Sequence, residues 1–124
     1  MAVMSPDKRM VEFLGKVAPS AIIPPEVSIW GTNYNIGKIL IKNPHAGELE
    51  IGVIFAIAVC NNEVIFGCEG FKAFQNKNNV YVTHSKLNNI VIEHANLADF
   101  HPLVRHGTPT NFMFVLHNYI TQFN

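Results

Sequence analysis

Four basic side chains in the second half of the chain are suited to contact nucleic-acid phosphates: Lys72, Lys77, Lys86 and Arg105. Aromatic residues stand between them, and aromatic rings stack on bases while cations neutralise phosphates. Scattered cations of this kind are also common on the solvated surface of a soluble protein. The sequence therefore marks these four residues as the candidate nucleic-acid-binding site, with a solvated face as the alternative.

Patterns typical of enzymes and metal sites are weaker. The segment Arg105-His106-Gly107 resembles the phosphorylated-His motif of histidine phosphatases, but it lies late in the chain instead of after a first strand. The six His residues lack the spacing of a metal site, and the Cys60–Cys68 spacing is poor for zinc. We therefore expect no enzyme activity, no catalytic residue, no cofactor and no bound metal.

The composition favours a protein that works with a partner. Apolar residues make up 48% of the chain and charged residues only 15%, which indicates that a second chain covers part of the surface. We expect a homodimer, and a different protein partner is the alternative. The net charge is zero, so no global field attracts nucleic acid or an anionic membrane. The lack of a signal-like N-terminus and of a long apolar run predicts a cytoplasmic protein without membrane contact.

Residues 49–74 predict the hairpin around which the other elements are arranged. Apolar residues alternate on both sides of Asn61-Asn62, and Asn tolerates the positive φ of a tight primed turn. With these two residues as the loop, the predicted cross-strand pairs are Cys60–Glu63, Ile57–Phe66 and Phe55–Cys68. One face of this hairpin carries the core. The other carries small apolar residues, which indicates a closely approaching helix or a second subunit.

The predicted elements before this hairpin are a helix, an arm and a strand. Ser5-Pro6-Asp7 begins a short amphipathic helix that extends to about Lys16. Residues 18–36 contain three prolines and read as an ordered arm, in which Trp30 is a packing anchor. The first strand follows at residues 38–42.

Beyond the hairpin, short strands are expected at residues 80–84 and 90–95. Two helices are then expected, at residues 97–104 and from Thr108 or Thr110 to Phe123. Short loops between strands favour antiparallel pairing, and helices grouped apart from the strands indicate an α+β class. We therefore predict an antiparallel meander of four or five strands with an N-terminal helix and one or two C-terminal helices. Residues 1–36 form the helix and arm, and residues 37–124 form a single α+β domain.

The order and spacing of the segments from Ile39 to Tyr119 resemble the septation protein SpoVG family. The matching segments are residues 39–43 (ILIKN), 47–49 (GEL), 64–74, 79–82 (NVYV), Ser85-Lys86 and Asn118-Tyr119. Members of that family are small homodimeric regulators that bind DNA and RNA, with basic residues around a Pro-Ser-basic segment. The resemblance implies the same fold and aligns Lys86 with the basic residue of that segment.

Two functions follow from these observations. The first is a small nucleic-acid-binding regulator similar to SpoVG, in which a local basic patch contacts phosphates. The alternative is a non-enzymatic protein-binding module, such as a phage, plasmid or immunity-type adaptor, which the zero net charge and the apolar surplus favour. The two differ in their response to salt, because phosphate binding weakens steeply with salt and an apolar interface does not.

Overall fold

The computed structural model describes residues 7–45, 48–77, 80–97, 101–109 and 111–115, with the backbone alone at residues 43–45 and 77. Its elements are α1 (Lys8–Leu14), β1 (Glu26–Ile29), β2 (Thr32–Asn35), β3 (Ile39–His45), β4 (Glu48–Cys60), β5 (Glu63–Lys77), β6 (Val80–Lys86), β7 (Ile90–Glu93), the 3-10 helix η1 (His94–Asn96), β8 (His106–Gly107) and β9 (Phe112–Val115).

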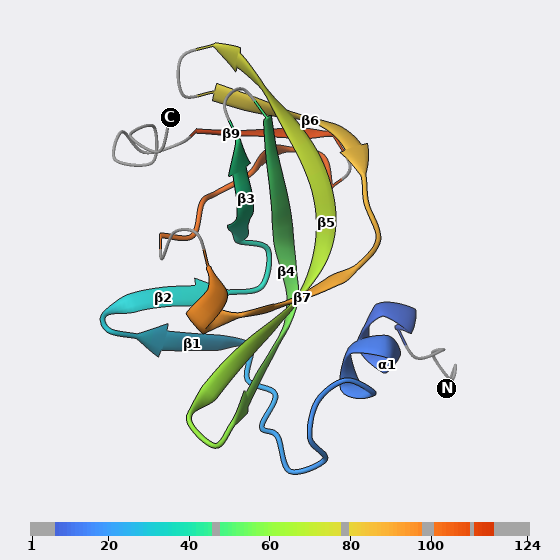
Figure 1. Ribbon diagram of the computed structural model, residues 1–124, viewed down its shortest axis with the longest axis vertical. Helices are drawn as coiled ribbons and strands as arrows, with labels where there is room; N and C mark the ends of the chain where they lie inside the picture. The colour runs from blue at the N-terminus through green and yellow to red at the C-terminus, as the bar shows by residue number, and fades with distance from the viewer. Residues whose placement is uncertain (1–6, 46–47, 78–79, 98–100, 110, 116–124) are drawn as a thin grey trace, which may run out of the picture.

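The strands from β3 to β9 build one curled antiparallel sheet, and β1 pairs with β2 as a separate hairpin (Figure 1). The strand order is β3-β4-β5-β6-β9-β8, and β7 pairs with β5 off this path. In Figure 1 the long β4–β5 hairpin runs from the top of the molecule to the bottom. Helix α1 lies on one side of its lower half, and the β1–β2 hairpin lies on the other.

The turn of the long hairpin is the one that the sequence predicts. Asn61 and Asn62 have φ values of 51° and 65°, as a type I′ turn requires. Two of the predicted pairs, Cys60–Glu63 and Ile57–Phe66, are observed. The predicted hairpin is therefore confirmed near its turn.

A β-bulge at Phe55 changes the register beyond that point. Cys68 pairs with Ile54 instead of Phe55, and the next pair is Ala56 with Gly67. Because a bulge inserts one residue into one strand only, it reverses which face the following side chains occupy. The predicted pair Phe55–Cys68 is thus wrong, and the buried side chains of β4 are divided among several clusters instead of lining one face.

Three clusters of buried apolar residues make up the core. The largest lies inside the curled upper sheet and contains Ile39, Ile41, Leu49, Ile51, Val53, Phe71, Ala73, Tyr81, Leu103, Phe112 and Phe114. The second lies between the long hairpin and the β1–β2 hairpin and contains Tyr34, Leu40, Ile54, Ile57, Phe66, Cys68, Ile92 and Leu97. The third joins α1 to the sheet through Phe13, Ala56 and Ala58.

Helix α1 packs against the small residues of the long hairpin. A Cβ atom added at Gly67 would lie 2.6 Å from Cδ1 of Phe13, so only glycine leaves room for this ring. Arg9 of the helix pairs with Glu69, whose second carboxylate oxygen lies 2.9 Å from Lys86 Nζ. The helix is therefore what covers this face within one chain. Cys60 and Cys68 are both free thiols.

The predicted α+β class is wrong, because the described residues are mostly strand and the expected C-terminal helices are not formed there. The described part of residues 97–109 is irregular apart from an isolated bridge at Leu103 and the short strand β8. Residues 112–115 instead form strand β9. The Thr83 hydroxyl accepts a hydrogen bond from the N–H of Phe112 and donates one to its C=O, both at 3.2 Å. The rest of the expected last helix, residues 116–123, lies outside the described residues.

Candidate functional site

The turn between β1 and β2 exposes the only tryptophan of the chain. Trp30 and Gly31 have φ values of 51° and 80°, so this is again a turn with two positive φ angles. A bulky residue rarely adopts positive φ, and the Trp30 side chain is 87% exposed. The predicted ordered arm therefore contains a β-hairpin, and the prediction that Trp30 is a packing anchor is wrong.

A series of ring contacts connects the core with Trp30. Phe66 and Tyr34, both fully buried, lie 5.1 Å apart between ring centroids. The ring of His94 meets Tyr34 edge-on at 5.5 Å, and the Tyr34 hydroxyl lies 3.4 Å from His94 Nε2. Trp30 is the outermost ring of the series and contacts His94, with the two ring centroids 5.7 Å apart at an interplanar angle of 71°. His94 is therefore half-buried and held on both sides, which orients it toward Trp30.

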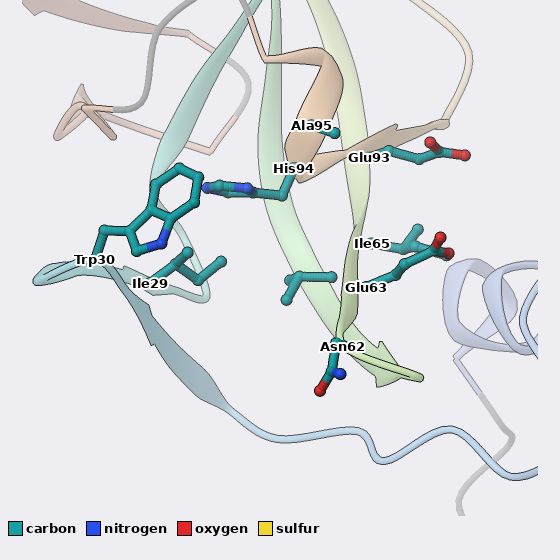
Figure 2. Close-up of a pocket in the computed structure, with 9 residues that line it drawn as sticks. Ile29, Trp30, Asn62, Glu63, Ile65, Glu93, His94 and Ala95 are labelled. Atoms are coloured by element: carbon teal, nitrogen blue, oxygen red, sulfur yellow. The ribbon is translucent and has the colours of Figure 1, made fainter.

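A pocket of about 350 Å³ lies beside these rings (Figure 2). Its lining residues are Ile29, Trp30, Asn62, Glu63, Val64, Ile65, Glu93, His94 and Ala95. Figure 2 shows the Trp30 and His94 rings next to each other on one side of β5, whereas the Glu63 and Glu93 side chains extend on the other side. The pocket thus combines an aromatic and apolar side with an acidic side.

The acidic side has no basic counterpart. No Lys or Arg lines this pocket, and none forms an ion pair with Glu63 or Glu93 in the described part of the chain. Both carboxylates are exposed and close to the β5 edge, so they give the pocket a negative potential. Such a pocket attracts cationic groups and repels phosphates.

The predicted nucleic-acid-binding residues lie elsewhere. Lys72 on β5 lies 3.6 Å from Glu48, and Lys86 on β6 lies 2.9 Å from Glu69. The Arg105 guanidinium lies over the Phe112 ring at 5.9 Å. The side chain of Lys77 is outside the described residues. Lys72 and Lys86 stand on adjacent strands, since Lys72 pairs with Ser85. Each pairs with a carboxylate that weakens its attraction for phosphate, and the assignment of these four residues stays a prediction.

His94 makes the stability of this region depend on pH. Burial lowers the pKa of His94 below its ordinary value of 6.5, because the ring loses water that would stabilise its charged form. The unfolded chain then binds the proton more tightly than the folded one, so stability should fall as pH drops from about 6.5 through the lowered folded pKa. Replacement His94→Gln should remove this part of the loss. The check is the melting temperature of both proteins at about pH 7.5 and about pH 5, and an equal drop in both would contradict this role for His94.

Features of other functional classes are missing from the described residues. No group of three or more His, Cys, Asp or Glu side chains there is placed to hold a metal ion. The Cys68 thiol is buried, and burial raises its pKa, so it is a poor nucleophile. No helix in the described segments has the length and apolar character needed to cross a membrane.

Comparisons of the chain with family models, curated proteins and solved structures found no match. They neither support nor contradict the resemblance to the SpoVG family, which stays a prediction. The Trp30 pocket is a site that the sequence reasoning missed. The one available signal was the Trp30-Gly31 pair between two short alternating segments, which resembles a hairpin turn with Trp in place of the usual Asn.

Proposed function

We propose that the protein is a non-enzymatic binding module that captures a segment of a partner protein in the Trp30 pocket. The observation that carries this proposal is the exposed Trp30 side chain in a turn that disfavours it. Asn-Gly is the preferred pair for such a turn. A residue in an unfavourable backbone region costs about 1–3 kcal/mol, and such strain is concentrated at functional sites.

Trp is well suited to this role. It brings a large rigid surface and an N–H donor, and it is enriched among the residues that contribute most to protein interfaces. His94, itself held by Tyr34, meets the Trp30 ring edge-on, so part of the side-chain freedom of Trp30 is restricted before a partner binds. An exposed aromatic ring on the apolar side of a pocket is therefore the feature of the described residues that best fits a binding site.

A partner protein fits this pocket better than a nucleic acid does. An aromatic ring can stack on a base, but the two carboxylates of the pocket would repel the phosphates that follow it. The nucleic-acid function would need the separate basic residues, of which Lys72 and Lys86 already pair with acids. Binding to a partner protein also agrees with the zero net charge of the chain.

Replacement of Trp30 by Asn should strongly weaken binding while leaving the fold intact. The variant loses the ring contact with His94, worth about 0.5–1.5 kcal/mol, and gains a residue that favours the turn. These terms are similar in size, so the free energy of unfolding should change by less than about 1 kcal/mol. Affinity for peptides selected from a random library displayed on phage should fall by at least about 30-fold.

The matched control is Val104→Asn, which changes another exposed apolar side chain, 53% exposed and outside the pocket lining. It should bind the selected peptides as the unmodified protein does. The proposal is wrong if the unmodified protein selects no peptides, or if Trp30→Asn binds them equally well. Salt-sensitive binding of mixed oligonucleotides that Lys77→Ala and Lys86→Ala together weaken would instead support the regulator function.

A further inference from the structure

Strand β5 has an open edge next to the Trp30 pocket. Strand β7 pairs with β5 only from Ile65 to Cys68, and β6 pairs with it only from Phe71 onward. The two residues before Ile65, Glu63 and Val64, have β4 on one side and no strand on the other among the described elements. An open edge offers backbone N–H and C=O groups to an extended chain.

Strand β7 ends where this open edge begins. Glu93 is the last residue of β7 to pair with β5, opposite Ile65, and the next residues form the 3-10 helix η1. His94 and Ala95 of this helix line the pocket beside Val64 instead of continuing the ladder. The place that a longer β7 would occupy is therefore part of the pocket.

The two faces at this edge differ in chemistry. Glu93 pairs with Ile65, so their side chains share a face, and Glu63 lies on the same face two residues away. Val64 points to the opposite face, where Ile29 and Trp30 lie. Figure 2 shows the same division, with the carboxylates on one side of β5 and the Trp30 and His94 rings on the other.

We infer that this edge takes an extended peptide as an added strand, with an apolar side chain against Val64 and Trp30 and a neighbouring Lys or Arg against Glu63 and Glu93. Successive side chains of a strand point to opposite faces, so one peptide reaches both sides. This inference rests on the proposed function and specifies the chemistry of the partner.

Charge and size both favour such an occupant. The lining contains two carboxylates and no Lys or Arg, which complements a basic side chain and disfavours an acidic one. A volume of about 350 Å³ holds a few side chains, not a folded surface. A short extended segment with alternating apolar and basic residues meets both conditions.

The test uses fluorescently labelled peptides and the full chain, with binding followed by fluorescence anisotropy. The first peptide alternates Leu and Lys, and the second has the same composition with the Leu and Lys residues in two blocks. The alternating peptide should bind at least about tenfold more tightly, because only it matches both faces at once. Two further versions of the alternating peptide carry N-methyl groups, one on all odd-numbered residues and one on all even-numbered residues. One version should lose binding and the other should keep it, because only alternate N–H groups of the peptide point to β5.

The carboxylates are tested by the double variant Glu63→Gln and Glu93→Gln. Two exposed ion pairs are lost, so binding of the alternating peptide should weaken by about three- to tenfold and depend less on salt. The control Glu12→Gln, which changes an exposed carboxylate on α1, should leave binding unchanged.

Three results would overturn the inference. These are no binding of the alternating peptide, equal binding of its two N-methylated versions, or unchanged binding after the Glu63 and Glu93 substitutions. The proposed function is judged separately by Trp30→Asn. If that variant still loses the library-selected peptides, the pocket binds a partner by another geometry. If it loses neither those nor the alternating peptide, the proposed function fails as well.

Discussion

Replacing Phe66 by Ala should lower the free energy of unfolding by about 3–5 kcal/mol, a large fraction of the total for a domain of this size. Phe66 is fully buried on β5, with its ring 5.1 Å from that of Tyr34 and 6.4 Å from that of His94. The substitution removes apolar surface and leaves a cavity that the surrounding strands cannot fill. The measurement is equilibrium unfolding in urea at neutral pH.

The same change should also weaken binding at Trp30. Tyr34 loses the ring on which it packs, so His94 is held less firmly and Trp30 loses part of its support. A suitable control is Phe74→Ala on the same strand, since Phe74 is 37% exposed and should contribute much less. A loss below about 1 kcal/mol for Phe66→Ala would contradict the assignment of this ring to the core.

Replacing Phe112 by Ala should cost a similar amount, about 3–5 kcal/mol. Phe112 is 2% exposed on β9 and meets Phe71 edge-on at 5.1 Å inside the upper cluster. The substitution should also weaken the pairing of β6 with β9, because the Thr83 hydroxyl hydrogen-bonds with the backbone of Phe112. Urea unfolding again gives the free energy.

The neighbouring residue supplies the control for this strand. Met113 is 44% exposed and points away from the cluster, so Met113→Ala should cost less than about 1 kcal/mol. In the helix predicted from the sequence, Phe112 belongs to the apolar stripe and Met113 lies alongside it, so the two residues would not alternate between buried and exposed as they do in a strand. Equal losses for the two variants would therefore contradict strand β9.

The parts of the fold that follow from local chemistry could be predicted. Asn61-Asn62 between two alternating segments specifies a hairpin turn, because few other residues adopt two consecutive positive φ angles. Helix α1 likewise follows from a capping residue and apolar spacing, although Asp7 accepts the capping bond from Arg9 in the structure. The small residues that receive Phe13 were also visible as an unusual face.

The remaining parts depend on contacts between distant segments. Nothing near Phe55 in the sequence marks a bulge, since an inserted residue is recognised only from the partner strand. Residues 112–115 read Phe-Met-Phe-Val, and such a short apolar run fits either a strand or one side of a helix. The strand is formed because β6 offers Val82 and Tyr81 as pairing partners, which lie about thirty residues earlier in the chain.

The Trp30 pocket was missed for a related reason. Charged residues are visible in a sequence, but their partners are not, so the pairing of Lys86 with Glu69 could not be foreseen. Trp30 was interpreted as an anchor because large aromatic residues are usually buried. The structure exposes it because the two short strands on either side pair with each other and leave Trp30 at the turn.

The most direct test of the account is the fluorescence of Trp30, the single tryptophan of the chain, with and without a library-selected peptide. In the free protein we predict emission typical of a hydrated indole and strong quenching by acrylamide, because the side chain is 87% exposed. Peptide at saturation should shift the emission to shorter wavelength and reduce the quenching. Binding that leaves both properties unchanged, or an indole already protected in the free protein, would contradict the Trp30 pocket as the binding site.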